Sequence, residues 1–379
     1  MKAQLAAGVV VCLSVIAGCA GKKENASSRG EGQLGASSSD GALGGNAQQA
    51  QVEKPLFVGS AEDLQLSCQL SGKLNFLASQ GLSSSNSYLL ARFAMIGDPS
   101  LPFDKETLPK WLARFGLEKM VALENVGKGV KGFVATSSQF NLVVFQGTHS
   151  LQGAVTDLQA VVASASPNNI PGGMHNGFKS AYDTVSAQLS EALKAGREQK
   201  TPTYFVGHSL GGALAVIASS EQHKAGVNVA GVVTLGQPRV GNAEFTAAFE
   251  KALQNKYNRY VYENDPVPHL PPSQSTGNQV SSVVSGVNGI GGLLSSGMGL
   301  LFSRAAFTHA AAPQTLGNAR FSSSGFTNDD EWDKSYWGSN ASAVGQIVAN
   351  PQSALKDSVV ADHDVNKYLC SMLEKVDSN

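Results

Sequence analysis

The sequence has few charged residues. They make up 15% of the 379 positions, and 28 Lys and Arg against 29 Asp and Glu give a formal net charge of −1. A chain that binds nucleic acid usually carries a basic patch that neutralises phosphates. We therefore expect no nucleic-acid partner. The 42% of hydrophobic residues suffices for a core, and the length allows one large α/β domain or two small ones.

Long hydrophobic runs are scarce as well. The uncharged apolar run Leu5–Ala17, preceded by Lys2, is too short to cross a bilayer as a stable helix and is typical of a signal-peptide core. It leads into "IAGC", which ends at Cys19 and resembles the lipobox of bacterial lipoproteins. The resemblance implies a lipoprotein signal peptide over residues 1–18 and a lipid on Cys19. Ala20 then implies sorting to the outer membrane, on a side that stays open, whereas an ordinary signal peptide cut nearby is the alternative.

Large apolar residues are almost missing between the signal peptide and about Pro55. This segment consists mainly of Gly, Ser, Ala, Asn and Gln with scattered charges. Such a composition cannot bury enough surface to order itself. We predict a lipidated flexible tether over residues 19–55, followed by a folded domain over residues 56–379.

Cysteine is rare, with four residues in the chain. Cys12 leaves with the signal peptide and Cys19 is taken by lipid, so that Cys68 and Cys370 remain. In an exported protein two remaining thiols more often pair than stay free. We expect a disulfide between them, and two separate buried thiols are the alternative.

Strand and helix patterns alternate through the middle of the chain, with short connections between them. Alternation of this kind predicts a mostly parallel sheet covered by helices on both faces. The predicted strands are Asn141–Gln146 (fed by a hairpin), Thr203–Val206, Val227–Leu235 and Arg259–Glu263; the predicted helices are Phe178–Glu198, Leu210–His223, Ala243–Leu253 and a last one that opens at His363.

The stretch "TYFVGHSLGGAL" places Ser209 between a predicted strand and a predicted helix. A serine on such a sharp turn has strained backbone angles, and side chains at Gly207 and Gly211 would collide with the neighbouring strand and helix. The context favours Ser209 as a nucleophile over a serine in an ordinary glycine-rich connection.

An acid and a base should follow the serine, each after a strand. Asp265 comes directly after "RYVYEN" and before Pro266, where a loop carboxylate is expected, although Asp before Pro is often only a turn former. Three histidines follow it. His269 lies only four residues on, His309 sits in an apolar stretch typical of a core histidine, and His363 opens a helix from a loop. We predict His363 as the base, with His309 as the alternative.

An oxyanion hole needs two donors. The backbone N–H of Leu210, directly after the nucleophile, is the first. The second is expected from the loop after an earlier strand, where "VVFQGTHS" places Thr148 with its N–H and hydroxyl.

Five segments, "VVFQGT", "MHNGF", "GHSLGGALA", "TLGQPRVGN" and "ENDPVPHLPP", together resemble the class 3 lipases, the group typified by secreted fungal triacylglycerol lipases. The resemblance implies an α/β-hydrolase fold, and it gives Ser209, Asp265 and His363 the roles of nucleophile, acid and base. It also implies Thr148 and Leu210 at the oxyanion hole, with a disulfide that fastens an N-terminal segment to the C-terminal end.

Two departures from the family stand out. Gln146 replaces the usual arginine before Gly147, and the lid segment "SLQGAVTDLQA" has no tryptophan. Both bear on acyl preference and interfacial activation rather than on the reaction itself.

An uncharged insert, Ser273–Ser303, separates the predicted acid from the predicted base. Over residues 280–302 its apolar side chains follow helical spacing, but its six glycines argue against a stable transmembrane helix. Three interpretations remain open: an interfacial flap that docks on lipid, a second lid over the site, or a surface loop.

Taken together, the residues predict a serine ester hydrolase that releases fatty acids from acylglycerols through an acyl-enzyme, with no metal or organic cofactor. Its partners would be an acyl lipid and a membrane, reached through Cys19 and the segment 280–302. Phospholipase A1 activity and a carboxylesterase or feruloyl-type esterase are alternatives within the enzyme class. A non-catalytic surface-binding module is the alternative outside it.

Overall fold

The computed structural model describes residues 52–64, 66–97, 106–147, 162–164, 171–262, 264–271, 273, 276, 307–317, 329–349 and 360–377. The predicted signal peptide, Cys19, almost all of the tether, Thr148 and nearly all of the insert lie outside these residues. Val52–Asn379 forms one unit by its internal contacts.

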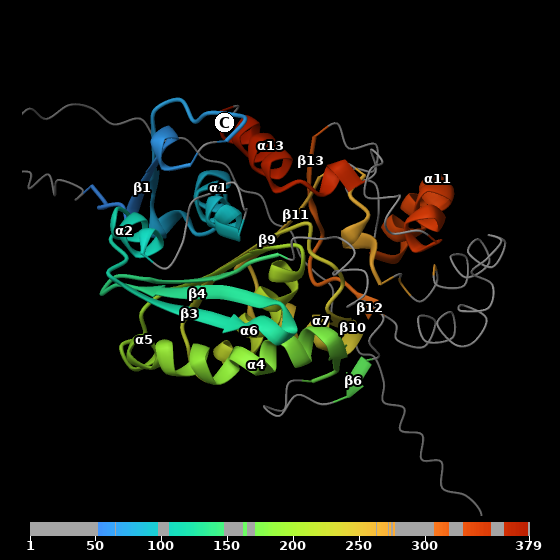
Figure 1. The fold of residues 1–379 in the computed structure, drawn as a ribbon, viewed down its shortest axis with the longest axis horizontal. Helices are drawn as coiled ribbons and strands as arrows, with labels where there is room; N and C mark the ends of the chain where they lie inside the picture. Colours follow the sequence, from blue (N-terminus) through green and yellow to red (C-terminus); the bar gives the residue numbers. More distant parts are fainter. Residues whose placement is uncertain are drawn as a thin grey trace, which may run out of the picture. The chain divides into compact units, whose positions relative to one another are not determined.

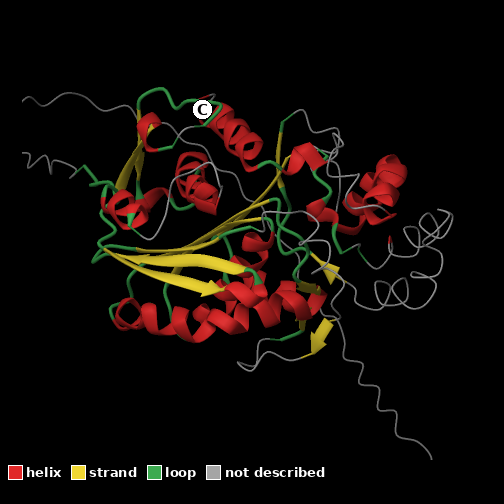
Figure 2. Cartoon of the chain, viewed as in Figure 1, coloured by secondary structure: helices red, strands yellow, loops and turns green. Residues whose placement is uncertain are grey.

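A seven-stranded sheet runs through the middle of this unit (Figures 1 and 2). Its order is β13-β11-β9-β8-β5-β4-β3, and the five strands from β13 to β5 are parallel. The other two join as an antiparallel meander with β5. The strands are β3 (Lys119–Asn125), β4 (Val130–Thr136), β5 (Asn141–Phe145), β8 (Thr203–His208), β9 (Val229–Leu235), β11 (Tyr257–Tyr262) and β13 (Gln314–Leu316).

Helices cover both faces of this sheet, as Figure 1 shows. On one face pack α4 (Asn176–Ala192), α6 (Leu210–Lys224) and α7 (Ala243–Ala252), and on the other α1 (Ser84–Ala91) and α13 (Val365–Asp377). Alternate side chains of β5 pack against different helices. Val143 and Phe145 lie in the core beneath α4, α6 and α7, and Leu142 and Val144 lie in the core beneath α1 and α13. Because the central strands are buried on both faces, their sequences are largely apolar without polar residues at every second position.

Smaller elements flank this framework. The antiparallel pair β1 (Phe57–Ser60) and β2 (Lys73–Phe76) and the helix α2 (Thr107–Ala113) precede β3 in sequence. The short helix α5 (Lys194–Glu198) follows α4, and α11 (Asp329–Ala349) follows β13. A second, four-stranded sheet has the order β12-β10-β7-β6, from Phe307–Thr308, Gly241–Asn242, Gly173–His175 and Val162–Ser164.

The predicted α/β architecture is confirmed, and the structure corrects three details. The predicted helix Phe178–Glu198 is two helices, α4 and α5, which meet at Leu193, where ψ is −1°. The last helix begins at Val365, while His363 ends a short 3-10 helix, Val360–His363. The strand expected to begin at Val227 begins at Val229.

The predicted disulfide is confirmed. Cys68 and Cys370 are bonded, with their Cα atoms 5.4 Å apart, and they are separated by 302 positions in sequence. The alternative of two separate buried thiols is therefore wrong. The bond fastens the segment after β1 to α13, the helix that follows His363.

Among the helices in the described part of the chain, none is both long and apolar enough to cross a membrane.

Candidate active site

Ser209 stands on a sharp turn between β8 and α6. Its φ of 58° and ψ of −129° lie in a region that non-glycine residues rarely adopt, and the residue is 3% exposed. The turn is held because the Ser209 N–H donates to the Leu235 carbonyl (2.9 Å) and the Ser209 carbonyl accepts from the Gly212 N–H (2.9 Å). Backbone strain of this kind persists only where the surroundings impose it, and it clusters at functional sites.

The glycines around this turn are required by close backbone approach. A Cβ atom on Gly207 would lie 2.1 Å from the Gly211 carbonyl oxygen, and one on Gly211 would lie 2.2 Å from the Phe145 carbonyl oxygen. Both distances are well inside van der Waals contact. A side chain at either position would therefore collide with the neighbouring backbone, as the sequence predicted.

Asp265 and His363 form a buried pair. Nδ1 of His363 lies 2.7 Å from Oδ2 of Asp265, which is fully buried at the carboxyl end of β11. The second oxygen of Asp265 accepts the Val267 N–H at 2.9 Å. A carboxylate bonded to Nδ1 fixes the imidazole tautomer and leaves Nε2 to act as a base.

The imidazole of His363 lies beside His208, the residue that precedes Ser209. Nε2 of His363 is buried and has no hydrogen-bond partner among the residues that the structure describes. The ring of His208, the residue before Ser209, lies 4.5 Å from the His363 ring, measured between centroids. Burial, and then the neighbouring His363, lower the pKa of His208 well below its ordinary value.

Two further residues complete this cluster, and the sequence pointed to neither. The Tyr368 hydroxyl, on α13, donates to Oδ2 of Asp265 at 2.5 Å, and burial followed by the Asp265 charge raises the pKa of Tyr368 well above its ordinary value. Gly236 has a φ of 55°, and a Cβ there would lie 2.8 Å from Oδ2 of Asp265 and 2.9 Å from Cε1 of His363. In the sequence, a tyrosine in the first turn of an amphipathic helix is expected to pack in the core. Nothing in the sequence therefore marked Tyr368 as a residue of the site.

The alternative bases lie elsewhere. Nε2 of His309 bonds to the Pro268 carbonyl at 2.7 Å, and burial, followed by the nearby Arg259, lowers the pKa of His309 well below its ordinary value. Nδ1 of His269 bonds to Asp333 at 3.0 Å. Of the three candidate histidines, the structure brings only His363 to Asp265.

Of the two predicted oxyanion donors, Leu210 and Thr148, the structure describes Leu210. Leu210 begins α6, a helix whose N-terminal N–H groups point to the turn at Ser209. A Cβ on Gly147 would lie 3.1 Å from the His208 carbonyl oxygen and 3.4 Å from Ser209 Cβ, so the end of the loop after β5 touches the turn. Thr148, the next residue, lies outside the described residues. The Gln146 side chain, before Gly147, donates to the Ile96 carbonyl at 3.1 Å.

Within the described residues, no group of three or more His, Cys, Asp or Glu side chains is arranged to hold a metal ion.

A mostly parallel sheet with Ser209 on the turn after β8, Asp265 in the loop after β11 and His363 at the end of the 3-10 helix before α13 defines an α/β hydrolase. Residues 142–275 match the model of the class 3 lipase family. That match contains the serine turn and Asp265, and it ends before His363.

Curated relatives share the same part of the chain. Lipase ZK262.3 of Caenorhabditis elegans is 30% identical over 193 residues, which are 50% of this chain and 52% of that protein. A lipase of Rhizopus niveus is 35% identical over 153 residues, 37% of this chain and 38% of the relative. The chain thus spans about half or less of the length of these relatives. Among solved structures, the Rhizomucor miehei lipase propeptide complex matches with a TM-score of 0.41 and 25% identity, covering 49% of this chain and 62% of the other.

Proposed function

We propose that this chain is a serine carboxylic ester hydrolase that releases fatty acids from acylglycerols. The observation that carries the proposal is the buried Asp265–His363 pair beside the strained turn of Ser209. The match of residues 142–275 to the class 3 lipase family supports the same reaction.

In the first step His363 Nε2 removes the proton from Ser209 Oγ, which attacks the ester carbonyl carbon. Asp265, bonded to Nδ1, stabilises the imidazolium that forms, and the proton then passes to the leaving alcohol. In the second step His363 removes a proton from a water molecule, whose oxygen attacks the acyl carbonyl carbon. The proton then passes from His363 to Ser209 Oγ as the ester bond breaks, which releases the fatty acid and restores the serine. The route requires no metal or organic cofactor.

Two backbone donors would stabilise the negative charge on the carbonyl oxygen. The N–H of Leu210 is supported by its place at the start of α6, and that of Thr148 by the contact of Gly147 with the serine turn. Donors fixed in advance at the developing oxyanion are among the largest contributions to acyl-transfer catalysis.

The substrate class rests on the relatives. Besides the lipases above, a protein named secreted mono- and diacylglycerol lipase 1, from Fusarium solani, is 39% identical over 102 residues. These names support an acylglycerol substrate and an exported enzyme for this chain. A panel of esters that varies acyl length and head group would separate lipase from phospholipase A1 or small-ester activity.

We also propose that the enzyme is an outer-membrane lipoprotein. Support comes from the sequence alone: the "IAGC" segment ending at Cys19, the Ala20 that follows it, and the polar tether over residues 19–55. Cys19→Ser should abolish incorporation of labelled palmitate and release the protein from the membrane fraction. Incorporation that persists in Cys19→Ser would refute the anchor.

The uncharged insert is proposed as a second membrane contact, through residues 280–302. Without basic residues its binding would rest on buried apolar area, so it should be nearly insensitive to salt. Protein lacking Cys19 should bind neutral phosphatidylcholine vesicles, and Leu294→Asp with Leu301→Asp should abolish that binding and the turnover of emulsified long-chain substrate. If hydrolysis of a short soluble ester fell equally, the insert would be a cover over the site instead.

The reaction itself is tested by a fluorophosphonate probe, which labels an activated serine. The wild type should be labelled, and Ser209→Ala should lose both labelling and at least about a thousandfold in ester turnover. Ser219→Ala is the matched control. Ser219 is a buried serine on α6, the helix that follows Ser209, and its hydroxyl donates to the Val216 carbonyl. Near-full activity in Ser209→Ala would refute the mechanism, and absent labelling of the wild type would favour a non-catalytic binding module.

A further inference from the structure

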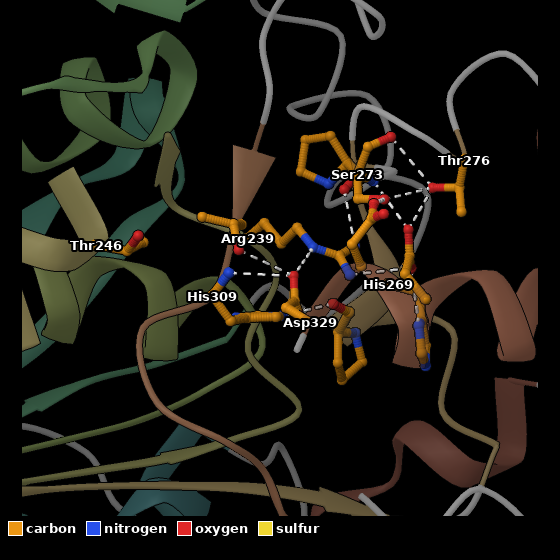
Figure 3. A network of polar contacts seen from close by, with 12 residues as sticks. Arg239, Thr246, His269, Ser273, Thr276, His309 and Asp329 are labelled. Atoms are coloured by element: carbon orange, nitrogen blue, oxygen red, sulfur yellow. Dashed lines mark hydrogen bonds and ion pairs between the residues drawn. The ribbon is translucent and has the colours of Figure 1, made fainter. Parts of the chain in front are cut away.

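A buried ionic cluster joins α11 to the loop that carries Asp265 (Figure 3). At its centre the guanidinium of Arg239 is fully buried. Its Nε lies 2.9 Å from Oδ2 of Asp329 and its Nη2 lies 3.0 Å from Oδ1 of Asp333, both in the first part of α11. The third nitrogen, Nη1, donates to the Pro271 carbonyl at 3.0 Å. One arginine thus contacts both the helix and the loop.

Asp333 also contacts the loop directly. Its Oδ1 accepts from Nδ1 of His269 at 3.0 Å, and its Oδ2 accepts the Ser273 N–H at 2.9 Å and the Thr276 hydroxyl. Burial by itself would raise the pKa of Asp333, but Arg239 and these hydrogen bonds outweigh burial and lower the pKa to about 2. Asp333 is therefore a charged acceptor at neutral pH, and hydrogen bonds to a charged group are the stronger kind.

Besides the contacts of Arg239 and Asp333, Tyr336, one helical turn after Asp333, also joins α11 to the loop. Its ring stacks on the ring of His269, with centroids 3.6 Å apart and planes at 9°. The His269 ring also contacts the ring of Trp332, at 3.9 Å. The Tyr336 hydroxyl donates to the carbonyl of Asn264 at 3.1 Å, directly before the proposed triad acid.

These attachments lie on both sides of Asp265. Asn264 precedes it, and His269 and Ser273 follow it, so that α11 holds the loop at its beginning, middle and end. Loops are in general more mobile than the elements they connect, and a catalytic group has to be held within about 0.5 Å by the residues around it. A single helix supplies that support here.

We propose that α11 braces the loop that carries the triad acid Asp265, and that Asp333 and Tyr336 are positioning residues for Asp265. This inference rests on the proposed function, since it gives Asp265 the role of orienting His363. Neither residue touches the reacting atoms. Their effect passes through Asn264 and His269 to the backbone that sets the Asp265 carboxylate against Nδ1 of His363.

Tyr336→Phe tests the brace most sharply, because it keeps the ring on His269 and removes the hydroxyl that donates to Asn264. With a short soluble ester we expect kcat to fall about threefold to tenfold, the change that corresponds to one ordinary hydrogen bond, with KM unchanged. A displaced Asp265 stabilises the imidazolium less, so the acidic limb of the kcat/KM profile should move to lower pH. Asp333→Asn should move it in the same direction and further.

Tyr182→Phe is the matched control. Tyr182 is a buried tyrosine on α4 whose hydroxyl accepts from Gln222, away from the loop. Its substitution should lower the unfolding temperature without moving the pH profile. If Tyr336→Phe and Asp333→Asn both lower the unfolding temperature while kcat and the pH profile stay at wild-type values, the cluster is structural only and the brace is refuted. The triad is judged separately, by Ser209→Ala.

Discussion

Nδ1 of His363 and Oδ2 of Asp265 lie 2.7 Å apart, although 98 positions separate the two residues in sequence. One follows the parallel strand β11 and the other directly precedes α13, so the pair exists only in the folded chain. The uncharged insert and α11 both fall between them in sequence. The chain can therefore carry long insertions here without changing the distance on which the proposed chemistry depends.

The first prediction separates the two histidines. His363→Ala should lower kcat/KM for a short ester about as much as Ser209→Ala, because members of one triad act as a unit. His309→Ala should cost far less, since His309 bonds to the Pro268 carbonyl and not to Asp265. Steady-state kinetics on both purified variants checks this, and an inactive His309→Ala with an active His363→Ala would reverse the assignment.

A second prediction concerns Tyr368. Tyr368→Phe removes a hydrogen bond from the Asp265 carboxylate and leaves the aromatic packing of α13 in place. We expect kcat to fall about tenfold, the order of one hydrogen bond to a charged group, while KM stays nearly constant. Wild-type kcat in a correctly folded Tyr368→Phe would show that Asp265 needs no support from α13.

A third prediction uses two glycines that differ in what surrounds them. Gly236 and Gly226 both have positive φ, but a Cβ on Gly236 would strike Asp265 and His363, whereas one on Gly226 would meet nothing within 4 Å. Gly226→Ala should cost about 1 kcal/mol of unfolding free energy through strain alone, with activity retained. Gly236→Ala should in addition lower kcat at least about tenfold, because it displaces the pair. Equal activity in the two variants would contradict the geometry.

The parts of this fold that could be predicted from the sequence are those with a local signal. The strand, turn and helix around Ser209 follow one another directly in sequence, and the burial of β8 on both faces gives the apolar run Tyr204–Val206. Asp265 could be chosen because it ends a strand, and His363 because chain order removed most competitors. Each of these inferences needs only neighbours in sequence or a rule of order.

The rest depends on contacts between distant residues. Arg239 and Asp329 are 90 positions apart and give no pattern at either site. The helix α11 contains Gly338 and several Ser and Asn residues, which are weak helix formers, so that tertiary contacts rather than propensity account for it. Strand β13 is three residues long, and its pairing with β11 is what identifies it.

A fourth prediction follows from the disulfide. The bond joins residues 302 positions apart, and closing so long a loop restricts the unfolded chain strongly. Cys68→Ala with Cys370→Ala should lower the unfolding free energy by about 2–4 kcal/mol, measured by denaturant unfolding. Reductant should lower the wild type by a similar amount and leave the double variant unchanged. An unaltered midpoint in the double variant would mean that packing alone fixes α13.

The last prediction concerns pH and the buried histidine His309. Burial, and then Arg259, lower its pKa well below the ordinary value of 6.5, so that the folded chain keeps it neutral while the unfolded chain takes up a proton. The unfolded state binds more protons in this window, and the free energy of unfolding therefore falls as the pH drops below about 6.5, by up to about 1.4 kcal/mol per pH unit for one such group. His309→Gln should reduce that slope between pH 6.5 and 5, whatever it does to the absolute stability. His223→Gln, at the partly exposed end of α6, should reduce it less. Denaturant titrations at several pH values measure both slopes, and an unchanged slope in His309→Gln would show that His309 takes up its proton equally in the folded and unfolded chain.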